Sequence, residues 1–156
     1  MSLAAYRKKG IHRQELYRKN GIFRLPLMCR FSYYIDQSGR SDVRETYDGG
    51  STQLRARFLS RVTSLAQLSR DEWHDGYFKN LSGPGDGLSE LRFKADRVQQ
   101  RPLGFHLSNA EFVILFWATE KGGKFVPLSA CEKAQKRKLE ILAGTSKAHA
   151  LWLALE

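Results

Sequence analysis

Cysteine is scarce in this 156-residue chain, and neither of its two cysteines belongs to a recognisable motif. Cys29 and Cys131 are far apart in the sequence, and neither is part of a Cys-x-x-Cys pair. The spacing therefore indicates neither a zinc site nor a disulfide framework. A disulfide between the two is an alternative, but a reduced, cytoplasmic chain is the simpler interpretation.

Long apolar runs and the common cofactor motifs are also absent. The longest apolar run, Phe112 to Ala118, is far shorter than the roughly 20 residues that span a bilayer. The first 25 residues contain no apolar segment of the signal-peptide kind, so we expect no membrane partner. GxxxxGK[ST], GxGxxG and HExxH are missing, and the four histidines are dispersed. We therefore expect no cofactor and no metal site.

Acidic residues are few relative to basic ones, and the imbalance is concentrated at one end. The chain has 26 Lys and Arg against 16 Asp and Glu, a net charge of +10. Residues 1–30 carry eight of the basic residues and only one acidic residue, Glu15. We interpret residues 1–27 as a basic N-terminal arm. Such an arm favours a polyanionic partner, although it could also be a solvated tail.

The remaining sequence has the periodicities of a small α+β domain. Leu54, Phe58, Val62 and Leu65 recur at helical spacing, whereas residues 88–119 alternate as strands do. The predicted elements are a strand at 28–35, helices at 51–68 and 69–73, strands at 88–95, 101–107 and 111–119, a helix at 131–143 and a helical tail from 148. Tight loops join the successive strands, so we expect a small, mainly antiparallel sheet of about four strands. Two N-terminal helices should cover one face, with a C-terminal helix beside them.

The predicted domain boundaries follow from these elements. Residues 28–147 form the folded domain, and residues 148–156 form an apolar C-terminal tail. We expect Asp36 to Gly50 to be loop, because the segment is polar and contains three glycines.

Two of the predicted strands place polar side chains opposite their apolar rows. Leu91 and Phe93 share one face, and Arg92 and Lys94 share the other. On the next strand His106 lies opposite the apolar row, whereas Arg101 shares that row and reaches the open face only if Pro102 breaks the strand. Arginine can clamp a phosphate with two hydrogen bonds, and a histidine can transfer protons near neutral pH.

These residues are the candidate site of a phosphodiester-cleaving enzyme. Arg92, Arg101 and His106 are the candidate catalytic residues, with the 2′-hydroxyl of RNA as the nucleophile and no need for a metal ion. The alternative is that the strand cations are merely solvated and that His106 is structural.

Four segments, taken in order, resemble the RelE/HigB-type toxin superfamily, in particular its phage-derived HigB-like branch. They are FKNLSGPGDGLSELRFK at 78–94, RPLGFHL at 101–107, EFVILFWATEKGGKF at 111–125 and ACEKAQKRKLEILA at 130–143. The resemblance implies a RelE-like fold of the microbial ribonuclease type. It also implies ribosome-dependent mRNA cleavage by the toxin component of a type II toxin-antitoxin system, and neutralisation by a small antitoxin protein.

The resemblance also assigns positions. Arg92 and Arg101 match the strand arginines of the superfamily, and Lys133 and Lys136 match part of its basic C-terminal segment. The expected RNA-binding residues are cations on the strands, on a turn and on the C-terminal helix: Lys94, Lys124, Lys133, Lys136 and Arg137.

Two other functions are compatible with the same fold. The protein could be a non-catalytic, phage-derived binding protein, or a gyrase-inhibiting toxin that does not cut RNA. Growth arrest with mRNA cleavage would indicate the endoribonuclease toxin. Growth arrest with DNA damage would indicate the gyrase inhibitor, and no arrest would indicate the non-catalytic binding protein.

Overall fold

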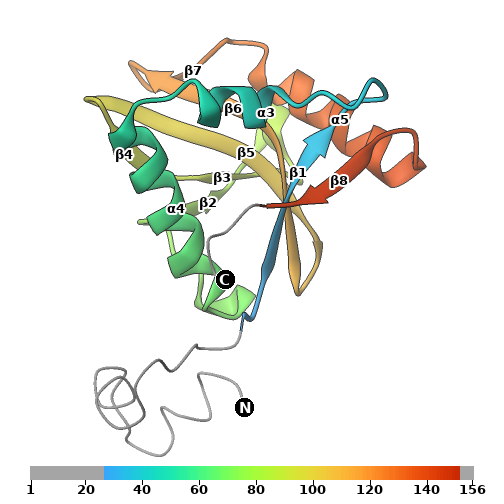
Figure 1. The fold of residues 1–156 in the computed structure, drawn as a ribbon, viewed down its shortest axis with the longest axis horizontal. Helices are drawn as coiled ribbons and strands as arrows, with labels where there is room; N and C mark the ends of the chain where they lie inside the picture. Colours follow the sequence, from blue (N-terminus) through green and yellow to red (C-terminus); the bar gives the residue numbers. More distant parts are fainter. Residues whose placement is uncertain (1–26, 152–156) are drawn as a thin grey trace, which may run out of the picture.

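Residues 27–151 are the part of the chain that the computed structural model describes, and their fold is a mixed β-sheet with helices on both faces (Figure 1). The strands are β1 (Arg30–Ile35), β2 (Phe78–Asn80), β3 (Ser89–Leu91), β4 (Phe93–Ala95), β5 (Val98–Ser108), β6 (Glu111–Lys121), β7 (Lys124–Val126) and β8 (Lys147–Ala150). The helices are α3 (Asp42–Asp48), α4 (Thr52–Ala66) and α5 (Ala130–Ala143), with 3₁₀ turns η1 (Arg70–Glu72) and η2 (Gly83–Gly85).

The long β5–β6 hairpin is the centre of the sheet. The strand order is β2-β3-β5-β6-β1-β8, with β4 beside β5 and β7 beside β6. β1 runs parallel to β6, whereas the other pairs are antiparallel. Phe112 to Ala118 in β6 are buried without interruption, as expected for a central strand that is covered on both faces.

The predicted small sheet of about four mainly antiparallel strands, with two N-terminal helices on one face, is therefore wrong. The described chain forms an eight-stranded mixed sheet. β2 and β8 were missed because strands of three and four residues show too little alternation to be recognised. The predicted second helix at 69–73 is only the 3₁₀ turn η1, and α3 lies in a segment that we expected to be loop.

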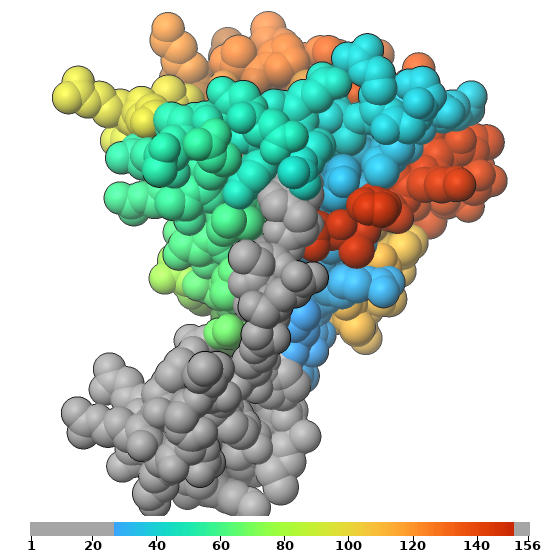
Figure 2. Space-filling view, viewed as in Figure 1, coloured from blue at the N-terminus to red at the C-terminus, as the bar shows by residue number. Residues whose placement is uncertain are grey.

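The sheet separates two hydrophobic cores. α3 and α4 cover one face, where Phe58 of α4 packs with Phe93 of β4 and Trp117 of β6. α5 covers the other face over Leu103, Phe105 and Leu115. Figure 2 shows α3 and α4 (cyan to green) next to each other on the first face. The predicted helix at 51–68 is confirmed as α4, and its expected contact with the Leu91 and Phe93 row is also confirmed.

The expected contact of α4 with the Leu103 and Phe105 row is wrong. Leu103 pairs with Glu90, not with Leu91, across the ladder between β3 and β5. Because paired residues point to the same face of a sheet, Leu103 lies on the face opposite Leu91. It is α5 that covers it.

The start of α4 holds the tip of the β4–β5 hairpin. The loop residues Asp96 and Arg97 have positive φ angles of 51° and 65°, as a two-residue type I′ turn requires. Ser51, which caps α4, donates a hydrogen bond to the Asp96 carboxylate, and the Asp96 N–H donates to Gln53. These bonds fix β4 relative to α4.

Both predicted terminal segments lie largely outside the described residues. The basic arm is described only at Leu27, which is exposed. The predicted helical tail is wrong at its start, because Lys147 to Ala150 form β8 against β1. Within residues 27–151, none of the helices has the length and apolar character required to cross a bilayer.

Candidate nucleic-acid interface

The ladder between the β3–β4 edge and β5 is interrupted at Arg92. β3 ends at Leu91, β4 begins at Phe93, and the paired residues on β5 jump from Leu103 to Gln100. Pro102 lies in this interval and has no N–H to offer. The Arg92 N–H instead bonds to the Tyr77 carbonyl, at 2.9 Å. The sheet is therefore open at this position, and side chains from both strands reach the opening.

A pocket of about 370 Å³ occupies this opening, and we call it the cationic pocket. Its lining residues are Arg61, Gly76, Arg92, Phe93, Lys94, Gln99 and Arg101. Four of these seven residues carry a positive charge and none carries a negative charge. The structure thus brings together three cations that the sequence predicted, Arg92, Lys94 and Arg101, and adds Arg61 from α4.

Arg61 was not among the predicted site residues, because helical spacing indicated only a surface arginine. Its guanidinium carbon lies 3.5 Å from the centre of the Tyr77 ring, which draws the side chain to the pocket edge. Its Nε is buried and has no hydrogen-bond partner among the described residues. Only the packing of α4 beside the loop before β2 reveals its place in the pocket.

Two carboxylates lie behind the arginines. Arg101 is 4% exposed, and its Nε lies 2.9 Å from Glu120 and 3.7 Å from Glu90. The Arg92 Nε lies 3.2 Å from Glu90. Burial raises the pKa of Glu90, while Arg101 and Arg92 oppose this shift. The carboxylates orient the two guanidinium groups, but they also offset part of the positive charge.

The remaining charge of the pocket is nevertheless positive. Four cations line it, against the two carboxylates behind them. Within residues 27–151, no carboxylate lies at ion-pair distance from Arg61 or Lys94. An anion that enters the pocket would therefore meet two cations with unneutralised charge, besides the guanidinium groups of Arg92 and Arg101.

A second pocket, of about 280 Å³, adjoins the first and shares Arg92 with it. We call it the mixed pocket, because Lys79 and Arg92 line it together with Glu90 and Glu120. Gly123 and Phe125, beside Lys124 at the β6–β7 turn, complete part of its rim. Arg92 is therefore the residue that the two pockets have in common.

His106 lines neither pocket. Its ring packs against Trp73, Phe112 and Phe78, with centroid distances of 4.7, 5.0 and 5.9 Å. Burial and the nearby Arg70 lower its pKa to about 4. The structure therefore does not bring His106 to Arg92 and Arg101, and it surrounds the imidazole as it would a core aromatic ring.

The other predicted RNA-binding cations lie around α5 and the β6–β7 turn. Arg137 makes two hydrogen bonds to the Asp42 carboxylate, at 2.7 and 2.8 Å, and a third to the Leu115 carbonyl. These bonds tie α5 to α3 and to the sheet, which is a structural task. Lys133 lies over the Phe116 ring at 5.3 Å. Lys124 and Lys136 are exposed.

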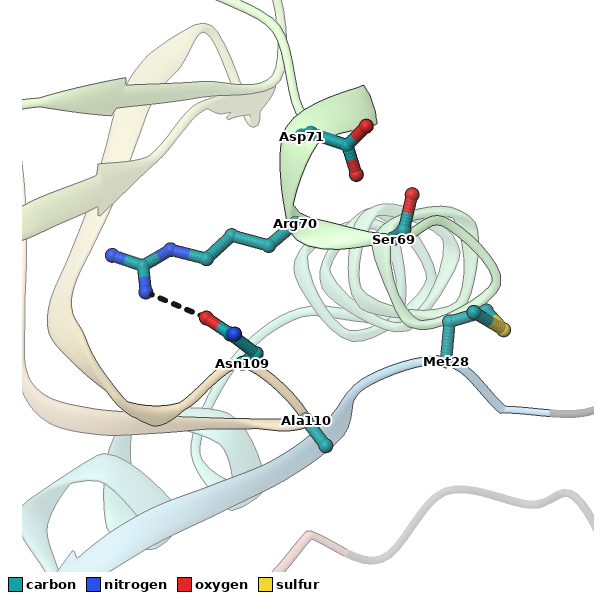
Figure 3. A pocket seen from close by; sticks show the side chains of 6 residues that line it. All are labelled: Met28, Ser69, Arg70, Asp71, Asn109 and Ala110. Atoms are coloured by element: carbon teal, nitrogen blue, oxygen red, sulfur yellow. Dashed lines mark hydrogen bonds between the residues drawn. The ribbon is translucent and has the colours of Figure 1, made fainter. Parts of the chain in front are cut away.

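A larger cavity, of about 670 Å³, lies at the other end of the β5–β6 hairpin. Figure 3 shows Arg70 reaching across it to Asn109, whose Oδ1 accepts a hydrogen bond of 3.1 Å. Met28, Ser69, Asp71 and Ala110 complete its lining. This set has one cation and one carboxylate and no histidine or cysteine. Nowhere in the described part of the chain do three His, Cys, Asp or Glu side chains gather as a possible metal site.

The cationic pocket is therefore the described site with the clearest chemistry. Guanidinium groups recognise phosphate through paired hydrogen bonds, and lysine adds a point charge. Comparisons of the chain with known family models, with curated proteins and with solved structures gave no match.

Proposed function

We propose that this protein binds RNA in the cationic pocket and cleaves it as a metal-independent endoribonuclease, a toxin of the RelE/HigB type acting on ribosome-bound mRNA. One observation carries the proposal. Arg92, Lys94 and Arg101, selected from the sequence as phosphate ligands, line a single pocket together with Arg61, and no carboxylate shares that lining.

In the proposed reaction the RNA supplies the nucleophile. The 2′-oxygen forms a bond to phosphorus and the bond from phosphorus to the 5′-oxygen breaks, which leaves a 2′,3′-cyclic phosphate and a 5′-hydroxyl. Arg92 and Arg101 stabilise the charge that develops on the phosphoryl oxygens. Arg61 and Lys94 neutralise the flanking phosphates.

The proton of the 2′-hydroxyl needs an acceptor, and the leaving 5′-oxygen takes a proton from water. His106 does not accept the proton of the 2′-hydroxyl in this reaction, because its ring is packed away from both pockets. Glu120 is the better candidate. Its side chain is 27% exposed, it lines the mixed pocket, and its carboxylate lies 2.9 Å from the Arg101 Nε.

A second candidate function is RNA binding without cleavage. The position of His106 favours it, because the histidine predicted to transfer a proton is absent from the pocket lining. Under this second function, the four cations hold RNA as a ligand, and Glu90 and Glu120 only orient Arg92 and Arg101.

Induced expression in a bacterial host, followed by mapping of mRNA 5′ ends, tests the proposal. Wild type should arrest growth and generate new 5′ ends within translated messages, and Arg92→Ala should not. Lys147→Ala, at an exposed cation on β8, is the matched control and should behave as wild type. RNA binding without new 5′ ends would select the second function, and growth arrest with DNA damage would select a gyrase inhibitor.

Co-expression addresses the proposed antitoxin. A small protein encoded beside this chain should restore growth and co-purify with it if the toxin assignment is correct. Growth that is never arrested, together with no measurable RNA binding, would contradict both functions.

A further inference from the structure

Two aromatic rings lie beside the cationic pocket in the loop between η1 and β2. His74 and Tyr77 are both exposed, with ring centroids 4.6 Å apart and tilted by 42°. Gly76, between them in sequence, lines the cationic pocket. The loop is a tight turn, in which the His74 carbonyl accepts hydrogen bonds from the N–H groups of Tyr77 and Phe78, both at 3.1 Å.

The flanking residues hold this loop to the core. Trp73 and Phe78 are 8% and 7% exposed, and their rings meet edge-on at 5.1 Å. Tyr77, by contrast, is 36% exposed and is the one aromatic side chain among the exposed large apolar residues of the described chain. The loop therefore presents its two rings on a fixed base.

Arg61 connects the rings to the pocket. Its guanidinium stacks on Tyr77 at 3.5 Å while the same side chain lines the pocket. The His74 ring lies close to the backbone of Gly76, where a Cβ would come within 3.3 Å of two ring atoms. A ligand that places an anion among Arg61, Arg92 and Lys94 would therefore carry its neighbouring groups past these rings.

We propose that His74 and Tyr77 form a stacking subsite for one unpaired nucleobase, next to the phosphate held in the cationic pocket. This inference rests on the proposed function, because it requires RNA in that pocket. Single-stranded nucleic acid offers an anion and a flat ring within one nucleotide, and proteins bind it by pairing basic grooves with exposed aromatic side chains. An acidic peptide would satisfy the cations but would leave the rings without a flat partner.

The subsite can be tested by measuring, with fluorescence anisotropy, how tightly the protein binds single-stranded RNA oligonucleotides. Two oligonucleotides of equal length are compared, one intact and one with a row of abasic sites, so that the phosphates are the same. Tyr77→Ala should weaken binding of the intact oligonucleotide by about 5- to 100-fold, the range for loss of one stacked base. The abasic oligonucleotide should bind wild type weakly and lose little further affinity with Tyr77→Ala.

Two variants separate stacking from folding. Tyr77→Trp keeps a flat ring and should retain most of the affinity, while His149→Ala removes an exposed histidine from β8, away from the pocket, and should change nothing. An equal loss for both oligonucleotides with Tyr77→Ala, or no loss for either, would overturn the subsite. If Lys94→Ala weakens binding but Tyr77→Ala does not, the RNA-binding function stands and the subsite fails. If wild type binds neither oligonucleotide, the proposed function itself fails.

Discussion

At the scale of single residues, the environment of a side chain decides its chemistry more than its type does. Arg101 and His106 lie five positions apart on β5, and the sequence assigned both to one site. The structure gives Arg101 two carboxylate partners and a pocket, whereas it packs His106 among three aromatic rings. Strand alternation already separates the two, because positions 101 and 106 differ by an odd number: Arg101 pairs with Ala118 and His106 with Phe112, on opposite faces of the sheet. A shared site required Pro102 to break the strand, and β5 instead runs unbroken from Val98 to Ser108.

The half-buried imidazole of His106 predicts a pH-dependent stability. The pKa of His106 is lowered from 6.5 to about 4, so the unfolded chain binds a proton in this range while the folded chain does not. The free energy of unfolding should therefore fall as the pH decreases from 6.5 toward 4, by up to roughly 3 kcal/mol. His106→Phe should remove this component in urea denaturation measured across that pH range.

The same variant tests whether His106 takes part in catalysis. His106→Phe keeps a ring of similar size, so the cleavage rate should stay within about threefold of wild type, whereas loss of a general acid or base costs about 10²–10⁴-fold. An unchanged pH profile of stability, or a cleavage rate reduced by that larger factor, would contradict the packing role.

Gly104 is a second residue whose neighbours fix its identity. A Cβ there would lie 2.2 Å from the Val113 carbonyl oxygen and 2.6 Å from the Phe112 ring. Gly104→Ala should cost about 1–3 kcal/mol or more, because β5 would have to move away from β6. Gly49→Ala is the matched control, with the nearest atom at 3.3 Å, and should stay within about 1 kcal/mol. Chemical denaturation of the two variants gives both values, and equal stabilities would refute the close approach.

At the scale of elements, long periodic segments could be predicted and short ones could not. The spacing of Phe58, Val62 and Leu65 predicts α4, and the long apolar run predicts β6. α3 is seven residues long and depends on the Ser41 cap and on Arg137 of α5, whose partner Asp42 is 95 positions away. β8 reads Lys-Ala-His-Ala, a sequence with no strand preference, and exists because β1 offers it an edge. Contacts between residues so far apart in the chain leave no local sequence pattern from which α3 or β8 could be predicted.

α4 anchors the first core and should be sensitive to one truncation. Phe58 is fully buried and meets Tyr47, Phe93 and Trp117 at ring distances of 5.7, 6.1 and 4.7 Å. Phe58→Ala should lower the free energy of unfolding by about 3–5 kcal/mol. Arg57→Ala, at the preceding exposed position, should change it by less than about 0.5 kcal/mol. A small effect of Phe58→Ala would show that α4 does not pack as described.

At the scale of the whole molecule, charge is divided between the folded domain and the N-terminal arm. Residues 31–156 hold 18 basic and 15 acidic residues, so the proposed binding of RNA by the domain rests on the placement of a few cations and not on its net charge. Strand alternation predicts Arg92 and Lys94 of the cationic pocket, and it includes Arg101 only if Pro102 breaks the strand. The sequence could not predict Arg61, because its place depends on how α4 and the loop before β2 come together.

We expect the N-terminal arm to contribute to RNA binding but not to the stability of the folded domain. Deleting residues 1–27 should leave the melting temperature nearly unchanged, since the segment is strongly basic and Gly10, Gly21 and Pro26 interrupt any long helix in it. It should also weaken RNA binding and flatten its salt dependence, because fewer counterions are released. Calorimetry and salt-dependent anisotropy measure the two effects. A large loss of stability would show that the arm contributes to the core.

The central claim is that the cationic pocket holds the phosphate that is cleaved, and the rate of mRNA cleavage by the purified protein on translating ribosomes tests it most directly. Arg92→Ala should slow the single-turnover rate by about 10²–10³-fold, with the Lys147→Ala control at the wild-type rate and all three proteins folded. Arg101→Ala should cause a similar loss, provided that circular dichroism shows it folded without its buried ion pairs. Cleavage by Arg92→Ala at the wild-type rate would contradict the account, as would a wild-type protein that leaves the mRNA intact.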